Sequence, residues 1–291
     1  MTDGGGACPE AARAKVNLSL RVLGRRDDGY HELESLVAFA DIGDTLTLTP
    51  GRALSLDIDG PLAGLCGAPA NNLVLKAAAA LAMQVDDVTL EFGRFILTKE
   101  LPVAAGLGGG SADAAAALRL LALTNGLLSD DPRLRIAAAT IGADVPVCLA
   151  SRARVMRGVG EQLGPVLDIG ALPALLVNPG VALATKDVFA ALRLALPSDV
   201  KTAEVPSSRA ALVAWLAENG NDLEPPAMML QPVIADVLAA LRALPRCCLA
   251  RMSGSGATCF GLFESAADAD AAAKALQAKQ PAWWVRATTL S

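Results

Sequence analysis

The sequence predicts an α+β fold with two domains, and three observations support this prediction. The 291 residues are enough to build two hydrophobic cores. Segments with alternating apolar residues, which are typical of half-buried strands, are separated by alanine- and leucine-rich segments of helical character. The second half follows the order strand, loop, strand, helix, strand, which favours an α+β sandwich. We place the boundary so that one domain covers residues 1–160 and the other residues 161–291.

The first half of the chain is predicted to hold most of the strands. The predicted strands are 13–24, two strands within 32–50 that are separated at Gly43, 53–58 and 88–97. A turn is expected at residues 25–31, and a further turn at 143–146. The predicted helices are 73–83, 111–124 and 132–140.

The second half alternates strands and helices. Its predicted strands are 174–178, 248–252, 258–263 and a last strand near 284–289. Its predicted helices are 186–194, 209–218, 232–243 and 266–278. A short loop, 253–256, joins two of these strands.

Composition excludes several classes of protein. Hydrophobic residues make up 53% of the chain and aromatic residues 3%, so alanine, leucine and valine must build the cores. The net charge of −5 argues against a nucleic-acid binder with a basic patch. The six cysteines have no C-x-x-C spacing, so we expect reduced thiols in a cytoplasmic protein rather than a zinc site. The N-terminus does not resemble a signal peptide, and the longest uncharged run, 169–185, contains two prolines, so no membrane span is expected.

A glycine cluster between a strand and a helix is the most informative feature. Four glycines, Gly106, Gly108, Gly109 and Gly110, allow positive φ and a close approach of the backbone to a ligand. We expect Ser111 to cap the helix that follows. The free N–H groups and the positive dipole end of such a helix form an anion site, and phosphate fits it best.

Two better-known phosphate motifs do not match this cluster. A Walker A loop requires a lysine after its glycines, and none is present here. A dinucleotide fingerprint beginning at Gly106 would place Ser111 where the last glycine should be. A glycine-rich turn without a ligand is the remaining alternative, and it is disfavoured by four glycines placed before a well-capped helix.

Lys15 and Asp144 are the residues best suited to catalysis. Asp144 lies among apolar residues between a glycine and a proline, which suggests a partly buried carboxylate, although a turn-capping role is the simpler alternative. Lys15 is similarly isolated in an alternating strand. A lysine partner would keep a buried carboxylate ionised, although the sequence does not show that the two residues meet.

Tyr30 and His31 are the only tyrosine and the only histidine, and they are adjacent in a turn. Together they offer a stacking face and a ring that can donate and accept hydrogen bonds, which suits a heteroaromatic ligand as well as a plain surface turn. The loop 253–256, Ser-Gly-Ser-Gly, needs no ligand as a hairpin. Together with the glycine cluster it would suit a polyphosphate held from both sides.

Taken together, these residues resemble the GHMP superfamily of small-molecule kinases. The three motifs of that superfamily match the strand around Lys15 and Asn17, the ATP loop P-x-x-x-G-L-G-G-G-S at 102–111, and the loop 253–256. Further matching segments are ARAKVNLSL at 12–20, DGYHELESL at 28–36, GLGGGSADAAA at 106–116, GADVP at 142–146 and NDLE at 221–224. The resemblance implies an N-terminal domain like ribosomal protein S5 and a C-terminal ferredoxin-like domain.

The resemblance also implies the roles of individual residues. Lys15 and Asp144 match the catalytic pair. The residues that match the ATP-binding positions are Pro102, Val103, Ala104, Ala105, Gly106, Leu107, Gly108, Gly109, Gly110, Ser111, Ala112, Ser253 and Gly254. The residues that match the substrate-binding positions are Asn17, Tyr30, His31, Thr185 and Phe189, with Tyr30 and His31 in a cytidine pocket.

The implied activity is the transfer of a phosphoryl group from ATP to a hydroxyl of a small cytidine-diphosphate-linked substrate, with Mg²⁺ touching Ser111. No nucleic acid or membrane partner is implied, and we expect a monomer or a weak homodimer. Another kinase of the superfamily is the first alternative, but it would not explain Tyr30 and His31. A nucleotide sensor without activity and a dinucleotide oxidoreductase are more distant alternatives.

Overall fold

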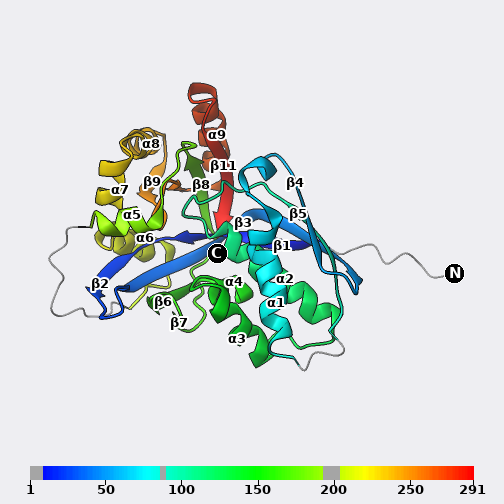
Figure 1. Cartoon of the computed structure of the whole chain (residues 1–291). Coiled ribbons are helices and arrows are strands. Elements are labelled where there is room, and N and C mark those ends of the chain that lie inside the picture. The colour runs from blue at the N-terminus through cyan, green and yellow to red at the C-terminus, as the bar shows by residue number, and fades with distance from the viewer. Residues whose placement is uncertain (1–8, 86–89, 193–203) are drawn as a thin grey trace. The chain divides into compact units, whose positions relative to one another are not determined.

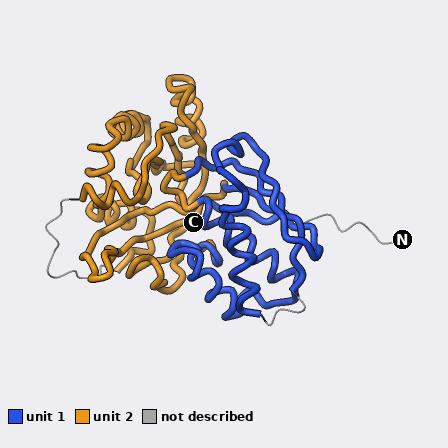
Figure 2. The backbone as a smooth tube through the Cα atoms, viewed as in Figure 1, with its two compact units in different colours: residues 1–14, 43–103, 109–150 blue, residues 15–42, 104–108, 151–291 orange. Residues whose placement is uncertain are grey.

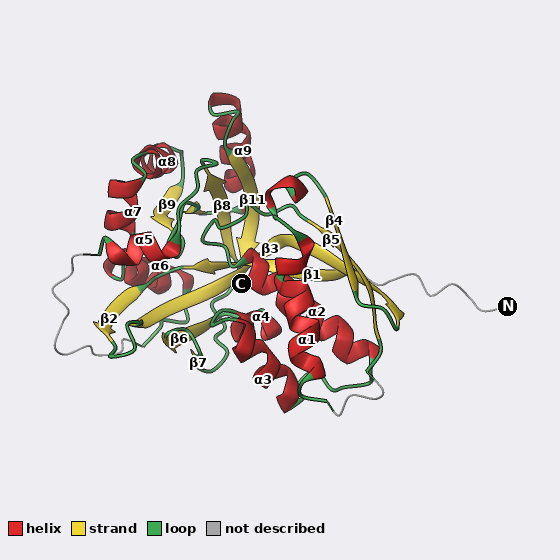
Figure 3. Cartoon of the chain, viewed as in Figure 1, coloured by secondary structure: helices red, strands yellow, loops and turns green. Residues whose placement is uncertain are grey.

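The computed structural model of the chain describes residues 9–85, 90–192 and 204–291. The chain forms two compact units that are interleaved along the sequence (Figure 2). Unit 1 contains residues 1–14, 43–103 and 109–150, and unit 2 contains residues 15–42, 104–108 and 151–291. Helices and strands occur in both units, as expected of an α+β protein (Figure 3).

In its described residues, unit 1 combines a small sheet with four α-helices. Strand β4 (Ser55–Asp59) is parallel to β5 (Phe92–Thr98), and β5 is antiparallel to residues 45–51 of the long strand β3 (His31–Gly51). The helices are α1 (Leu73–Ala82), α2 (Gly109–Thr124), α3 (Pro132–Ile141) and α4 (Val145–Ala150), with short 3-10 turns at Ala63–Leu65 and Pro69–Asn71. Helix α2 is the centre of this unit, because its many buried alanines let α1 and α4 pack closely against it.

Unit 2 is built on an antiparallel sheet with the order β3, β11, β8, β10, β9. Its strands, besides residues 31–42 of β3, are β8 (Leu172–Asn178), β9 (Cys247–Met252), β10 (Cys259–Phe263) and β11 (Trp284–Leu290). Strand β2 (Arg21–Arg25) forms a hairpin with the start of β3, which also pairs with β6 (Arg154–Gly158); β6 continues to β7 (Gln162–Leu163).

The helices of unit 2 cover this sheet and its margins. They are α5 (Thr185–Ala190), α6 (Arg209–Glu218), α7 (Glu224–Leu230), α8 (Val233–Arg242) and α9 (Ala266–Lys279). Helix α8 packs on β9 and β10, and α9 packs on β8 and β11 (Figure 1). The core beneath them is mostly leucine, valine and alanine with a few aromatic rings such as Phe263, as the composition predicts.

Two of the predicted strand boundaries differ from the structure. The predicted break at Gly43 does not occur, because β3 continues through it. A Cβ at Gly43 would lie 2.2 Å from the carbonyl oxygen of Ala12, so this glycine permits a close strand contact rather than a turn. The predicted strand 13–24 is instead divided into β1 (Glu10–Asn17) and β2. The division occurs because Leu18 and Ser19 both donate to the carbonyl of Leu36, as in a bulge.

The starts of two helices also differ from prediction. Helix α2 begins at Gly109, so Ser111 is its third residue and not its cap. The predicted turn at 143–146 instead leads into α4, which begins at Val145. Strands β6 and β7 and helix α7 were not predicted from the sequence. Parts of the predicted strand 88–97 and of the predicted helix 186–194 lie outside the described residues.

Candidate active site

The glycine loop is held by residues of a second loop far along the chain. Gly106 has a φ of 76°, and a Cβ there would lie 2.3 Å from the carbonyl oxygen of Ser253. Only glycine allows both the backbone angle and this close approach. Gly108 also has a positive φ, of 62°. Gly109 and Gly110 do not, because they form the first turn of α2, so the expectation of four left-handed glycines is wrong for two of them.

Ser253 joins three of the sequence motifs within unit 2. Its Oγ donates a hydrogen bond of 2.8 Å to the carbonyl of Gly106 and accepts one of 3.0 Å from the backbone N–H of Asn17. The N–H of Thr258 adds a bond to the carbonyl of Ala105. The strand with Asn17, the glycine loop and the loop 253–256 therefore meet at one buried hydroxyl.

Lys15 is buried beside the glycine loop. Its backbone N–H donates to the carbonyl of Leu107, and its Nζ donates to Oδ1 of Asn17 over 3.0 Å. A Cβ at Gly108 would lie 3.1 Å from Cε of Lys15, so the lysine stem packs directly on this glycine. The amide of Asn17 then donates from Nδ2 to Oγ of Ser35, over 2.7 Å. This chain of bonds fixes the direction of the lysine ammonium and of the Asn17 carboxamide.

A second cluster of unit 2 contains the only histidine. The rings of His31 and Phe189 stack with their centroids 4.8 Å apart and their planes at 23°. Tyr30, by contrast, is 65% exposed. Burial, followed by the positive charge of Arg25, lowers the pKa of His31 below its usual range. The imidazole is therefore neutral near pH 7 and can donate and accept one hydrogen bond each.

Helix α5 links this aromatic pair to the loop 253–256. Thr185 and Phe189 are four residues apart on α5, so their side chains project from the same face of the helix. The hydroxyl of Thr185 shares a hydrogen bond of 2.8 Å with that of Ser255. The structure thus connects the two predicted binding regions of unit 2 through one short helix.

Asp144 belongs to the other unit. It is half-buried directly before α4, and its carbonyl accepts the N–H of Cys148. The predicted site residues that lie with it in unit 1 are Pro102, Val103, Gly109, Gly110, Ser111 and Ala112. Since Lys15 lies in unit 2, the pairing of Lys15 with Asp144 stays a prediction.

Unit 1 contains a buried ionic cluster that was not predicted from the sequence. Nζ of Lys99 forms ion pairs with Oδ2 of Asp44 and, over 2.8 Å, with Oδ2 of Asp113. Oδ1 of Asp44 accepts the backbone N–H groups of Glu100 and Leu101. The side chains of all three charged residues are at most 5% exposed. This cluster ties β3 and the end of β5 to α2 within unit 1.

The charges of this cluster determine how its members titrate. Burial raises the pKa of Asp113 to about 7; Lys99 opposes this shift and Asp44 adds to it. Burial alone would lower the pKa of Lys99, but the two aspartates raise it above its usual range. The signal for the cluster in the sequence is Asp113, a charged residue within the alanine-rich segment that follows the loop.

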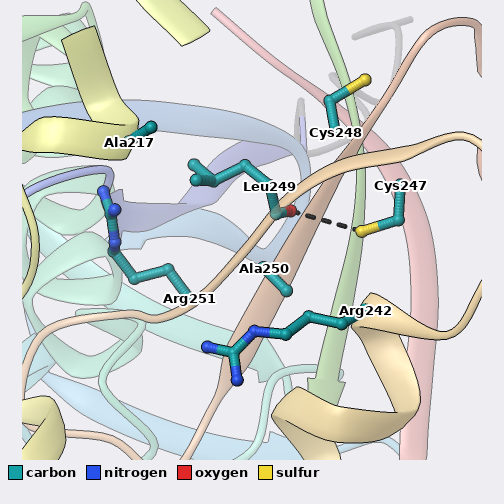
Figure 4. A pocket seen from close by; sticks show the side chains of 7 residues that line it. All are labelled: Ala217, Arg242, Cys247, Cys248, Leu249, Ala250 and Arg251. Carbon is teal, nitrogen blue, oxygen red and sulfur yellow. Dashed lines mark hydrogen bonds between the residues drawn. The ribbon is translucent and has the colours of Figure 1, made fainter. Parts of the chain in front are cut away.

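A separate pocket of about 340 Å³ lies on unit 2 along β9 (Figure 4). Arg242 reaches it from α8, and its remaining lining residues are Ala217 and residues 247–251. Its lining contains none of the residues predicted to form the active site. Among the described residues, no helix is both long enough and apolar enough to span a bilayer.

Two family models match separate segments of the chain. The model of the GHMP kinases N terminal domain matches residues 72–152, and that of the GHMP kinases C terminal matches residues 205–282. A 4-diphosphocytidyl-2-C-methyl-D-erythritol kinase of Rhodopseudomonas palustris is 58% identical over 302 residues, covering 100% of both chains. The kinase of the same name from Nitrobacter hamburgensis is 59% identical over 292 residues, covering 97% of this chain and 95% of that one.

Solved structures extend the comparison to three dimensions. A crystal structure of 4-(cytidine 5'-diphospho)-2C-methyl-D-erythritol kinase matches with a TM-score of 0.79 and 36% identity, covering 98% of this chain and 99% of that one. A homoserine kinase of Cytophaga hutchinsonii shares the fold, with a TM-score of 0.70 and 20% identity over 99% of this chain and 96% of that one. With relatives this similar over their full length, the chain belongs to the 4-diphosphocytidyl-2-C-methyl-D-erythritol kinase family of GHMP kinases.

Proposed function

We propose that this enzyme transfers the γ-phosphoryl group of ATP to the 2-hydroxyl of 4-diphosphocytidyl-2-C-methyl-D-erythritol, a step of the non-mevalonate route to isoprenoid precursors. Membership of the family supports the kinase activity and the substrate. The observation that carries the proposal in the structure is the junction at Ser253. There the glycine loop, the strand with Lys15 and Asn17, and the loop 253–256 are hydrogen-bonded to one another.

The proposed ATP site consists of residues 102–112 together with Ser253 and Gly254. Helix α2 is 16 residues long, and its first turn follows the glycine loop, so its free N–H groups and dipole favour a phosphate there. Gly106 and Gly108 shape the loop through their left-handed backbone. Such fixed backbone donors would stabilise charge on the β-phosphate as the bond to the γ-phosphorus breaks.

For the chemical step we propose Asp144 as the general base and Lys15 as its partner. Asp144 would accept the proton of the 2-hydroxyl, and the ammonium of Lys15 would keep Asp144 ionised and orient the hydroxyl. The bond from Lys15 to Asn17 supports this assignment, because it holds the ammonium in one direction. Asn17 would contact the substrate through the same polar network.

The cytidine would bind at Tyr30, His31 and Phe189, with Thr185 nearby. A neutral imidazole can pair with the donor and acceptor edge of cytosine. Because His31 and Phe189 stack on each other, the base would lie against an outer face of that pair or against the exposed ring of Tyr30.

Mg²⁺ is part of the proposal as the partner of ATP. Among the described residues no group of three or more His, Cys, Asp or Glu side chains could hold a metal. A single hydroxyl at Ser111, half-buried in the first turn of α2, fits Mg²⁺, which commonly takes few protein ligands and keeps waters and phosphate oxygens. When bound there, Mg²⁺ would neutralise phosphate charge.

The proposal also covers the domains, the location and the assembly of the enzyme. Residues 1–160 would form the domain like ribosomal protein S5 and residues 161–291 the ferredoxin-like domain; the two matched family segments fall on either side of this boundary. The enzyme would act in the cytoplasm as a monomer or weak homodimer, on a small molecule and without nucleic acid.

A substrate panel tests the proposed function. ADP formation is measured with the cytidine-linked methylerythritol, with unlinked methylerythritol, with homoserine and with mevalonate. We expect turnover only with the cytidine-linked compound. Equal turnover of homoserine or mevalonate would assign the chain another kinase activity, and nucleotide binding without turnover of any of the four would indicate a sensor.

A further inference from the structure

The segment NDLE, residues 221–224, has no role in the mechanism above, yet it contacts Gly254 of the proposed ATP site. Its backbone pairs with the chain at Leu20, which donates to the carbonyl of Gly220 and accepts from the N–H of Asp222. Its side chains bond to the backbone at Val22 on one side and at Met252 on the other. The segment therefore connects Leu20 and the start of β2 to the end of β9, from which the loop with Ser253 begins.

Asn221 makes the central contact. Its Nδ2 donates two hydrogen bonds of 2.8 Å, to the carbonyls of Met252 and Gly254, and its Oδ1 accepts the N–H of Leu223. Carbonyls can only accept and an N–H can only donate, so the orientation of this carboxamide is unambiguous. The residue is 7% exposed, and both polar atoms of its side chain are hydrogen-bonded.

These contacts lie along the open edge of β9, which is the last strand of the described sheet. The carboxylate of Glu224 accepts the N–H of Met252, and Asn221 binds the carbonyl of the same residue. Two side chains thus supply the pair of bonds that a neighbouring strand would otherwise make. The end of β9, from which the loop 253–256 starts, is held in place by them.

The loop itself depends on this support. Gly254 has a φ of 56°, and Asn221 binds its carbonyl, while Ser253 between the two bound carbonyls turns its hydroxyl toward Gly106 and Asn17. The loop is also held by bonds from the Ser253 N–H to the carbonyl of Thr258, from the Gly256 N–H to the carbonyl of Ser253, and between the hydroxyls of Ser255 and Thr185. Because Asn221 holds the carbonyls on both sides of Ser253, it also restricts the direction of the Ser253 hydroxyl.

We propose that Asn221 is a positioning residue for ATP binding: by holding the carbonyls of Met252 and Gly254, it keeps the loop 253–256 in the conformation in which Ser253 joins the glycine loop to Asn17. The inference rests on the proposed function, because that function assigns Ser253 and Gly254 to the ATP site. Asn221 itself touches the loop backbone and needs no contact with a ligand.

The variant Asn221→Asp tests this role because it keeps the shape and removes the donors. A carboxylate would face two carbonyl oxygens, so the loop would leave its binding conformation for part of the time. The apparent dissociation constant for ATP rises in inverse proportion to the fraction of the protein whose loop is in the binding conformation. We expect KM for ATP to rise about tenfold, which corresponds to about 1.4 kcal/mol, with kcat and KM for the cytidine-linked substrate changed by less than about threefold.

Two neighbours provide matched controls. Asp222 and Glu224 only accept hydrogen bonds, from Val22 and Met252 respectively. Asp222→Asn and Glu224→Gln keep an acceptor oxygen at the same place, so both variants should retain the parental KM for ATP. A rise in KM for ATP in these controls equal to that in Asn221→Asp would show general sensitivity of the segment and would overturn the specific role of Asn221.

A double-mutant cycle keeps the proposal testable if Asn221→Asp does not fold. Asn221→Ala, Ser253→Ala and the double variant are compared by KM for ATP and by thermal unfolding. If Asn221 acts through Ser253, the double variant should resemble Ser253→Ala, and the two effects should not add. Additive effects, or a lower melting temperature of Asn221→Ala with an unchanged KM for ATP, would reduce Asn221 to a structural residue and overturn the proposal. If the unaltered enzyme neither binds ATP nor turns over, the proposed function fails first and the inference falls with it.

Discussion

At the scale of single residues, the position of Lys15 is tightly constrained. Its ammonium is buried, donates to Asn17 and rests against the backbone of the glycine loop. A long side chain held in this way loses the freedom that a surface lysine keeps, and its charge acts in one direction. This is the arrangement expected of a residue that orients a reacting group.

We therefore predict that Asp144→Asn and Lys15→Ala each lower kcat at least ~100-fold, which is the usual size of the loss of a general base or its partner. The first variant keeps the shape of the carboxylate but accepts no proton. Steady-state kinetics with both substrates varied checks this prediction. A folded Asp144→Asn enzyme with parental kcat would remove the base assignment, and a Lys15 effect confined to KM would make that lysine a binding residue.

For His31 we predict a loss that is confined to one substrate. His31→Ala removes a partly buried hydrogen-bonding ring and its stack on Phe189, so binding of the cytidine-linked substrate should weaken by about 1 kcal/mol or more. ATP affinity should not change. Calorimetric titration of each ligand separates the outcomes, because an equal loss for both ligands would mean structural damage and no loss for either would contradict the cytidine assignment.

The pKa of His31 should make KM for the cytidine-linked substrate depend on pH. Burial lowers this pKa below its ordinary value of 6.5, so the ring is neutral above that pH and gains a proton only in more acidic solution. The protonated ring has no acceptor for the amino group of cytosine. KM for the cytidine-linked substrate should thus stay constant near pH 7 and rise well below pH 6.5, and His31→Ala should abolish this rise.

At the scale of elements, the glycine loop depends on a close approach of two backbones. In Gly106→Ala the new Cβ would lie 2.3 Å from the carbonyl of Ser253, and the φ of 76° would be strained as well. We predict that KM for ATP rises at least ~10-fold in this variant. Gly170→Ala is the matched control, because Gly170 has a φ of 65° and no atom within 4 Å of an added Cβ. An equal effect of both variants would attribute the loss to backbone strain alone.

The buried cluster at the start of α2 should make stability depend on pH. Asp113 has a pKa of about 7 in the folded protein and 3.8 as its ordinary value, so folding takes up a proton between these values. Its contribution to stability is complete below pH 3.8 and is lost as the pH rises to about 7. Asp113→Asn lacks this titration. We predict that the variant gains stability relative to the unaltered enzyme between pH 5 and pH 8, measured by urea unfolding.

Asp131→Asn is the control for this prediction. Its hydrogen bonds to Arg133 lower the pKa of Asp131 to about 2, so Asp131 stays ionised from pH 5 to pH 8 in both states. Asparagine also remains a good cap for α3. The stability difference between this variant and the unaltered enzyme should not change over the same range. A flat difference for Asp113→Asn as well would contradict the raised pKa of Asp113.

Local signals in the sequence predict single elements well and their ends less well. The sequence predicts a helix at 209–218, and α6 has these ends; it begins at Arg209 because Ser208 caps it by accepting the N–H of Ala211. A glycine is ambiguous by comparison. The same residue type marks a turn at Gly106, a helix start at Gly109 and a tight strand contact at Gly43, and only the surrounding chain decides between them.

At the scale of the whole molecule, the site could be predicted as separate motifs but not as an arrangement. The glycine loop, Lys15 and the loop 253–256 each have a recognisable local pattern. Their junction at Ser253 joins residues that are 147 and 236 positions apart, and no local pattern encodes such a contact. The cluster of Asp44, Lys99 and Asp113 was not predicted for the same reason, since its members lie on β3, directly after β5 and on α2.

For the assembly as a whole we predict a monomer or a weak homodimer. Sedimentation velocity over a wide range of protein concentrations should show a single-chain species that at most self-associates reversibly at the upper end. ADP formation per chain should not vary over the same range, because the proposed residues all come from one chain. A stable oligomer at low concentration, or activity that disappears on dilution, would contradict this prediction.

The interleaving of the two units limits how such a gene can recombine. The chain passes from one unit to the other at residues 14/15, 42/43, 103/104, 108/109 and 150/151. A single crossover between two homologous genes near residue 150 would therefore produce a chimera whose unit 2 comes from both parents. Its residues 15–42 and 104–108 would be inherited from one parent, and the Ser253 to which they bond from the other. Viable exchange at this point thus requires that the two parents have compatible residues at these contacts, because unit 2 is not encoded by one continuous segment.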